Sequence, residues 1–293
     1  MLLGWFADSA DPDAGLLTFR KVSDALGKTP WYLRLLRDEG AAAENLARVL
    51  SAGRLAPDLL MRAPEAVALL GDGGGGLRPR SRAHLEQEIL AAVRRADNAV
   101  QAVTAARGVR RRELFRTSAA DIVGSYGTES QPAEADQGAL VDLVGGAVSD
   151  LTAATLSGTL RAVVREGWGD TLPTRFAIIG MGRFGGHELG YGSDADVLFV
   201  HEPRDGVDER EAAEAANKVV AEMRRLLQVP SADPPLIVDA DLRPGGQVRP
   251  AGAHAHVVRG VLPPLVAGVG AARVAARRAR RRGRGAGPPA SPS

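Results

Sequence analysis

Two aspartates and a glycine-rich turn stand together in one short segment of this sequence. Residues 180–196 read GMGRFGGHELGYGSDAD and lie between two apolar runs, 176–179 and 197–200, which predict strands. Asp194 and Asp196 are two residues apart, so on a strand their carboxylates point to the same face. A glycine-rich turn lets backbone N–H groups approach phosphates, and paired carboxylates bind divalent cations. The combination predicts chemistry on a nucleoside triphosphate.

A third carboxylate follows on a later segment. Residues 234–243 alternate between apolar and polar side chains, which predicts a strand with Asp239 on its polar face. If this strand pairs with the one that bears Asp194 and Asp196, the three carboxylates lie together and suit two Mg²⁺ ions. An isolated Asp-x-Asp would more simply be a pair of turn and strand-end residues. The glycine turn before it and Asp239 after it argue against that interpretation.

Two other phosphate-binding motifs fit this segment poorly. Gly180-x-Gly182-x-x-Gly185 matches the dinucleotide-binding pattern, which needs a helix at the third glycine and an acidic residue about 20 positions later. Here further glycines follow, and the acidic residues arrive as a pair at 194 and 196. A Walker loop is excluded for this segment because no Gly-Lys-Ser/Thr follows its glycines.

Helical patterns dominate the chain before residue 170. Apolar residues recur at helical spacing in 1–70, 81–121 and 140–165. After the first predicted strands, the apolar pattern of residues 209–228 predicts an amphipathic helix. Arg110-Arg-Arg112 followed by Glu113 predicts a solvated or ion-paired helix face, with contact to a partner or a phosphate as the alternative. We therefore expect an α+β fold, with helices first and a small mixed sheet with flanking helices after them.

The composition limits the class of protein. Apolar residues make up 45% and charged residues 25%, as in an ordinary globular protein. We find no apolar stretch of about 20 residues and no signal peptide, so a membrane span is not expected. The absence of cysteine excludes disulfides and fits a cytoplasmic location. Residues 245–293 hold nine arginines and no acidic residue, which leaves 28 basic and 35 acidic residues before them. That acidic body makes nucleic-acid binding unexpected.

Taken together, the motifs resemble one enzyme family. The segments 180–196 and Val238-Asp-Ala-Asp-Leu-Arg-Pro244 are similar to the signature of glutamine synthetase adenylyltransferases, bifunctional enzymes with two related nucleotidyltransferase domains and a helical linker. Further similar segments are Pro12-Asp-x-Gly-Leu-Leu-x-Phe19, Trp31-Tyr32, Ala56–Pro64 and Arg110-Arg-Arg-Glu-Leu114. The form Gly190-Tyr-Gly-Ser193 resembles the C-terminal, adenylylating domain rather than the adenylyl-removing one.

This resemblance implies an activity and its residues. The expected reaction moves AMP from ATP to a tyrosine of glutamine synthetase, with Mg²⁺ as cofactor, in the regulation of nitrogen assimilation. Asp194, Asp196 and Asp239 are expected to hold the metal, and Asp239 to assist deprotonation of the acceptor hydroxyl. The expected triphosphate contacts are Gly180, Gly182, Arg183 and Ser193. Glutamine synthetase and a PII-type signalling protein are the expected partners.

Two positions depart from the family pattern. Arg183-Phe184 stands where Lys-Leu is commoner, which is a conservative change. Asp241 often corresponds to arginine or asparagine, so the local charge differs.

Four regions are predicted along the chain. They are a helical linker (1–72), a helical region (73–168), a partial nucleotidyltransferase core (169–244) and a basic, low-complexity tail without regular structure (245–293). The tail leaves the family pattern after Pro244, and its acid-free, Arg/Gly/Pro-rich composition is what an out-of-frame GC-rich gene gives. We hypothesise a single-base frameshift there, which the coding DNA would test; a genuine basic arm that binds nucleic acid is the alternative.

The resemblance also predicts a truncated enzyme. Met1 corresponds to a position midway along the family, so the adenylyl-removing half and the C-terminal helices of the second domain are expected to be absent. The alternative to an active enzyme is therefore a catalytically inactive fragment or a protein-binding module.

Overall fold

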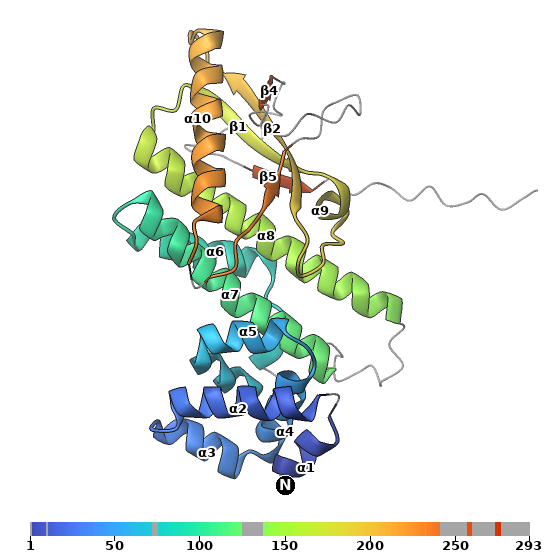
Figure 1. The fold of residues 1–293 in the computed structure, drawn as a ribbon. Coiled ribbons are helices and arrows are strands. Elements are labelled where there is room, and N and C mark those ends of the chain that lie inside the picture. Colours follow the sequence, from blue (N-terminus) through green and yellow to red (C-terminus); the bar gives the residue numbers. More distant parts are fainter. Residues whose placement is uncertain are drawn as a thin grey trace, which may run out of the picture.

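Helices come first along the chain and a sheet follows them (Figure 1). The computed structural model describes residues 2–9, 11–71, 76–124, 137–231, 233–240, 257–259 and 273–276. The helices before the sheet are α1 (Leu2–Ala7), α2 (Pro12–Leu26), α3 (Pro30–Asp38), α4 (Gly40–Ser51), α5 (Leu55–Arg62), the 3₁₀ helix η1 (Pro64–Leu70), α6 (Arg82–Arg95), α7 (Ala99–Val123) and α8 (Gln137–Gly167). The remaining elements are β1 (Thr174–Gly180), α9 (Gly182–Gly186), β2 (Ala195–Pro203), α10 (Glu209–Gln228), β3 (Val238–Asp239), β4 (Val257–Arg259) and β5 (Arg273–Ala276). The predicted α+β class is confirmed.

The first helices begin where the sequence supplies caps. The Asp11 carboxylate accepts a hydrogen bond from the Ala14 amide at 3.1 Å, and Pro12 occupies the first turn of α2. Thr29 and Pro30 stand in the same order at the start of α3, but the Thr29 side chain makes no capping hydrogen bond. The helical prediction for 1–70 is confirmed for its described residues.

The helical pattern of 81–121 is divided into two helices. α6 ends at Arg95, and Ala96 takes an extended backbone conformation. Asn98 then caps α7 by accepting a hydrogen bond from the Gln101 amide at 2.9 Å. The polar composition of residues 128–138 predicts a loop, and most of these residues lie outside the description.

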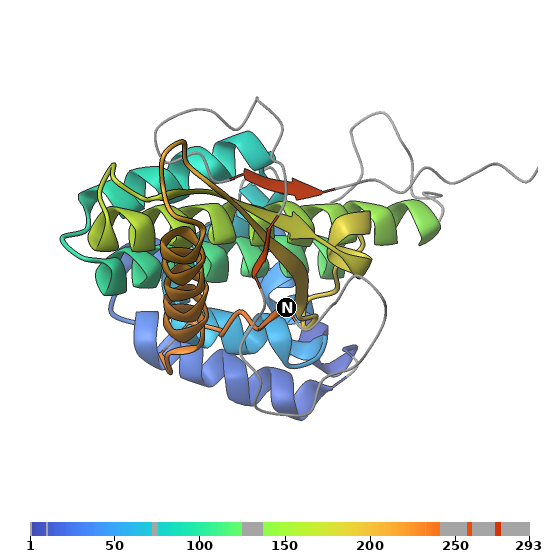
Figure 2. The same ribbon diagram turned by 90° about the horizontal axis from the view of Figure 1, so that it is seen from above.

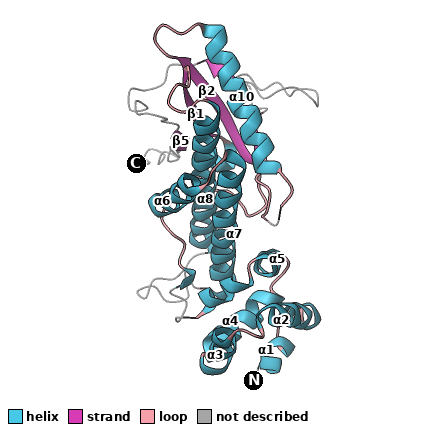
Figure 3. Cartoon of the chain, turned by 90° about the vertical axis from the view of Figure 1, so that its left-hand side faces the viewer, coloured by secondary structure: helices cyan, strands magenta, loops and turns pink. Residues whose placement is uncertain are grey.

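Long helices link the two ends of the molecule. α7 and α8 lie side by side between the N-terminal helices and the sheet, and α6 packs against both (Figure 3). A continuous hydrophobic core runs from Phe6 in α1 to Ala240 beside the sheet. The N-terminal helices and the sheet are therefore connected through one packed interior.

The sheet is mixed. Within the described residues five strands form it, and β1 pairs antiparallel with β2 over its whole length. β3 and β4 pair in parallel with successive parts of β2, and β5 pairs in parallel with β1. The strand predicted at 234–243 is confirmed at Val238–Asp239 and is wrong at 234–237 and 240, which form no strand. Residues 241–243 lie outside the description. The prediction of a tail without regular structure did not anticipate β4 and β5.

Side chains alternate between the two faces of the sheet. Phe176, Ile178 and Phe199 are buried in the main core, whereas Ala177 and Val200 form a small cluster of their own. α10 packs against β1, β2 and α8. Seen from above, α8 crosses the view lengthwise while α10 is viewed almost along its axis (Figure 2).

Among the described residues, one helix is long and apolar enough to be a candidate membrane span by length and composition alone. It is Leu140–Gly167 of α8, in which an 18-residue window has a mean hydropathy of 1.2 and is half buried inside the protein. α8 packs against α6, α7 and α10. Its apolar character therefore has a structural role in this fold.

Candidate active site

Two of the predicted carboxylates face each other across parallel strands. Asp196 in β2 is the register partner of Asp239 in β3, and the Ala195 amide donates to the Ile237 carbonyl at 2.9 Å. The adjacency expected from the alternating pattern is thus confirmed for this pair. Asp194 lies immediately before β2 and is exposed.

The three carboxylates interact electrostatically. Partial burial raises the pKa of Asp196, the nearby charges of Asp239 and Asp194 raise it further, and Arg183 acts in the opposite direction. Asp196 and Asp239 alternate with buried Val197 and Val238, so they lie on the face of the sheet opposite the helical core. Negative charge is thus concentrated at one edge of an accessible face.

At Gly182 the glycine-rich turn lies against the Asp196 carboxylate. Its φ is +50°, and a Cβ atom there would lie 2.6 Å from Oδ2 of Asp196. The Met181 amide also donates to the Asp196 carbonyl at 2.8 Å. Because neither the backbone angle nor the space admits a side chain, glycine is required for the turn to reach the carboxylate.

Close packing explains why Gly180 and Gly185 are glycines. Gly180 is buried at the end of β1, and a Cβ atom on it would lie 3.0 Å from the Phe184 ring. A Cβ atom on Gly185 would lie 2.5 Å from the Gly180 carbonyl oxygen. The predicted triphosphate contact of Gly180 is thus not needed to explain this glycine, and it stays a prediction.

Ser193 shapes the turn before the first aspartate. Its hydroxyl oxygen accepts a hydrogen bond from the Gly190 amide at 3.2 Å, and its own amide donates to the Gly190 carbonyl at 3.2 Å. Arg183 is exposed in the first turn of α9. Both residues border the segment that leads to Asp194, and their contact with a triphosphate stays a prediction.

Contacts from α7 and α8 also hold the loop before Asp194 (residues 187–193), and no sequence pattern predicted them. The Tyr191 hydroxyl donates to the Asp121 carboxylate at 3.2 Å, and the Leu189 amide donates to the Ser149 hydroxyl at 3.4 Å. A Cβ atom on Gly145 would lie 3.0 Å from the backbone of Glu188. These partners lie far away in the sequence and belong to no local motif, so no spacing pattern could have revealed them.

A cavity of about 520 Å³ adjoins the loop. The residues around it are Asp121, Leu140, Val141, Val144, Gly145, Arg183, Glu188, Leu189, Gly190 and Tyr191. Its lining is mainly apolar, with Asp121 and Arg183 among its charged groups. Arg183 both lines this cavity and acts on the pKa of Asp196, so the cavity lies near the carboxylates.

The donor set fits a hard divalent cation. Carboxylate oxygens suit Mg²⁺, and the raised pKa of Asp196 shows that its charge is poorly compensated by the protein. Across the described ranges, no group of three or more His, Cys, Asp and Glu side chains converges closely enough to hold a metal ion. The exposed carboxylate of Asp194 would therefore have to turn towards Asp196 and Asp239 to complete a metal site.

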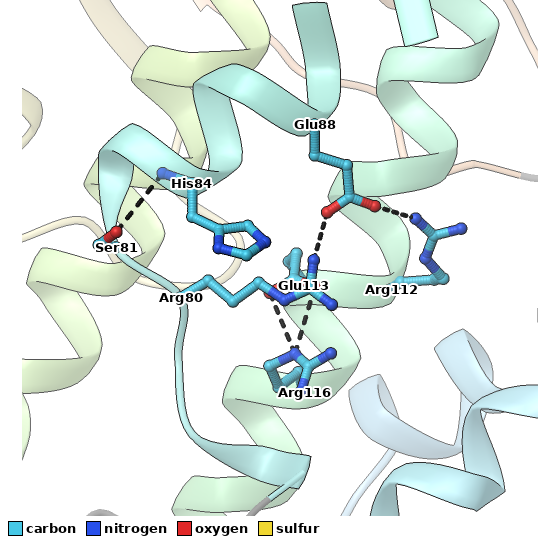
Figure 4. A network of polar contacts seen from close by, with 7 residues as sticks. All are labelled: Arg80, Ser81, His84, Glu88, Arg112, Glu113 and Arg116. Atoms are coloured by element: carbon cyan, nitrogen blue, oxygen red, sulfur yellow. Dashed lines mark hydrogen bonds and ion pairs between the residues drawn. The ribbon is translucent and has the colours of Figure 1, made fainter. Parts of the chain in front are cut away.

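Two residues of the arginine cluster noted in the sequence, Arg111 and Arg112, form ion pairs. Arg80 lies between Glu88 and Glu113, Arg112 donates to Glu88 at 2.6 Å, and Arg116 donates to Glu113 at 3.1 Å (Figure 4). The ion-paired interpretation of Arg112 and Glu113 is confirmed. Arg110 differs, because its side chain is buried rather than solvated.

Known sequences place this site in a family. The family described as glutamate-ammonia ligase adenylyltransferase matches residues 43–257, which is well over half of the chain. The chain belongs to this family. The resemblance inferred from the glycine turn and the aspartates is thus confirmed.

Individual adenylyltransferases are closely similar. A bifunctional glutamine synthetase adenylyltransferase/adenylyl-removing enzyme of Streptomyces coelicolor is 89% identical over 251 residues, 85% of this chain and 25% of that protein. Proteins of the same name from Streptomyces avermitilis and Nocardia farcinica are 85% and 47% identical, over 85% and 84% of this chain and 25% and 24% of those proteins. The chain therefore spans about a quarter of the length of these relatives.

The family match continues past Pro244 and ends at residue 257. Most of the remaining tail lies outside the described residues, apart from β4 and β5. The hypothesis of a frameshift in this chain therefore stays a prediction, as does the alternative of a nucleic-acid-binding arm.

Proposed function

We propose that this chain carries an adenylyl-transferring site, which moves AMP from ATP to a tyrosine hydroxyl of glutamine synthetase and releases pyrophosphate. The observation that carries the proposal is the pairing of Asp196 with Asp239 beside Gly182. The names of the similar proteins, which combine transfer and removal of the adenylyl group, support the same substrate. The form of the loop at Gly190–Ser193 favours transfer over removal.

Each residue of the site has a proposed role. Asp194, Asp196 and Asp239 would hold Mg²⁺, which supplies charge stabilisation for the attacking and leaving oxygens. Asp239 accepts the proton of the tyrosine hydroxyl while that oxygen bonds to the α-phosphorus and the bond to the bridging oxygen breaks. Gly180, Gly182, Arg183 and Ser193 orient the triphosphate.

The cavity beside the loop supports a nucleotide-sized substrate. Its volume of about 520 Å³ lies within the range of roughly 300–1,000 Å³ for small-molecule sites. Its apolar walls suit a nucleobase, and Arg183 at its border suits a phosphate. We therefore place the nucleoside of ATP in this cavity and the triphosphate towards Gly182.

Broader features of the chain belong to the same proposal. The chain divides into a linker (1–72), a helical region (73–168), a catalytic core (169–244) and a tail (245–293). A PII-type protein is a further proposed partner, and the cytoplasm is the proposed location.

Transfer of label from [α-³²P]ATP to glutamine synthetase tests the function. The full chain with Mg²⁺ should label glutamine synthetase, and Asp194→Asn should abolish the labelling. Asp205→Asn is the matched control, because Asp205 is exposed in the turn after β2 and should leave transfer unchanged. No transfer by a folded wild-type chain would instead support the alternative, a catalytically inactive fragment or protein-binding module.

A further inference from the structure

Three arginines of α7 point to the segment that joins α10 to β3. Arg107 donates through Nη1 to the Val229 carbonyl at 2.6 Å and through Nη2 to the Asp233 carbonyl at 2.8 Å. Arg111 forms an ion pair with the Asp233 carboxylate at 2.8 Å. Arg107 and Asp233 are both buried. In Figure 1 this segment leaves the lower end of α10 and turns back towards β2.

Arg107 satisfies groups that the helix end leaves open. The last carbonyls of a helix have no partner within the helix, and α10 ends at Gln228 with Val229 as its C-cap. A guanidinium group can donate to several carbonyls at once because its donors lie in a fixed plane. One side chain of α7 therefore fixes both the end of α10 and the turn at Asp233.

That turn leads directly to the third carboxylate. The Leu236 amide donates to the Leu227 carbonyl at 3.3 Å, and Val238 and Asp239 then pair with β2. In the described residues β3 is only two residues long. A strand of two residues forms few hydrogen bonds with its neighbour. The position of Asp239 therefore depends on how the preceding segment is anchored.

Arg110 provides an internal comparison. It lies three residues from Arg107 on the same helix and is also buried. Its bond to the Pro234 carbonyl is long, at 3.5 Å, whereas the two bonds of Arg107 measure 2.6 and 2.8 Å. Within the described structure the Nε atom has no hydrogen-bond partner in either arginine. Burial lowers its pKa to about 10. Arg110 is thus a buried cation that anchors the segment weakly.

We propose that Arg107 is a positioning residue for Asp239: by fixing Val229 and Asp233 to α7, it sets the place of β3 beside β2. This inference rests on the proposed function of Asp239 as part of the metal site. Arg111 strengthens the anchor through the side chain of Asp233. The catalytic edge is therefore held from the helical layer as well as through the sheet.

The test compares Arg107→Met with Arg110→Met in the full chain. Binding of Mn²⁺ in the presence of a non-cleavable ATP analogue, measured by calorimetry below the unfolding temperature, should weaken by about tenfold in Arg107→Met, as for other residues that support metal ligands. Arg110→Met should bind as the wild type does, and Arg107→Lys should recover part of the loss. Equal affinity in folded Arg107→Met and in wild type would overturn the proposal.

A second readout separates this inference from the proposed function. Hydrogen exchange at the amides of residues 236–240, measured without metal, should be at least about tenfold faster in Arg107→Met than in Arg110→Met. If the wild type binds no Mn²⁺ with the analogue, the proposed function fails while this exchange still tests the anchor. If Arg107→Met does not fold, Arg111→Met replaces it in both comparisons, and exchange as slow as in Arg110→Met would overturn the proposal.

Discussion

Gly182 is the residue at which the glycine turn meets the carboxylates. A side chain at this position would need a left-handed backbone and would press against Oδ2 of Asp196. We predict that Gly182→Ala lowers the free energy of unfolding by about 1–3 kcal/mol and weakens Mg²⁺-dependent ATP binding. Thermal unfolding and calorimetry would measure the two effects. Gly192→Ala is the control, because no atom lies within 4 Å of the place that a Cβ atom would take there and its φ is ordinary; equal behaviour of the two variants would contradict the prediction.

For single residues, the sequence predicts the features that follow from the alternation of apolar and polar side chains along a strand. The alternating positions of Leu236, Val238 and Asp239 predict that the carboxylate lies on the polar face of the strand. In the structure Leu236 and Val238 are buried and Asp239 is partly exposed. The hydrogen bond from Tyr191 to Asp121 joins residues 70 positions apart. Such a contact depends on how α7 packs against the loop, and no local pattern encodes it.

The N-terminal cap of α10 leads to a prediction about stability. The Asp208 carboxylate accepts hydrogen bonds from the amides of Arg210 at 2.9 Å and Glu211 at 3.2 Å, and so caps the helix. Asp208→Ala should therefore cost about 1 kcal/mol of unfolding free energy. Asp205→Ala, in the exposed turn just before, should leave the unfolding midpoint in a denaturant titration unchanged. Matching midpoints for both variants would show that the cap contributes nothing.

The cavity between α8 and the loop gives a second prediction for elements. Val141 lines it and is 70% exposed, whereas Leu143 is 51% exposed and does not line it. Val141→Trp should weaken binding of Mg²⁺–ATP by about tenfold, or about 1.4 kcal/mol, and leave binding of Mg²⁺–tripolyphosphate unchanged. Leu143→Trp should affect neither ligand. If Val141→Trp binds ATP as the wild type does, the nucleoside does not occupy this cavity.

The elements predicted most accurately are those that both an apolar pattern and a capping residue mark in the sequence. The bounds of α10 match the predicted 209–228 because an amphipathic pattern and a cap agree. The break between α6 and α7 was missed, since apolar spacing continues through it and only the capping contact of Asn98 marks it. β4 and β5 were also missed, because their strand pairing with β2 and β1 is not encoded in the basic tail itself.

The continuous core makes a prediction for the whole molecule. Because buried residues connect α1 to the sheet, the described body should unfold in one cooperative transition. Trp31 in α3 and Trp168 just after α8 report from the two ends. Variants that keep only one of these tryptophans should show the same midpoint by fluorescence. Midpoints several degrees apart would show that the N-terminal helices and the sheet unfold independently.

The central claim is that Asp194, Asp196 and Asp239 act as one metal and nucleotide site. The most direct measurement is calorimetric binding of Mn²⁺ with a non-cleavable ATP analogue to Asp196→Asn, Asp239→Asn and the control Asp205→Asn. The first two variants should lose binding, while the control should keep wild-type affinity. Wild-type affinity in folded Asp239→Asn would contradict the claim, because the third carboxylate would then play no part in the site.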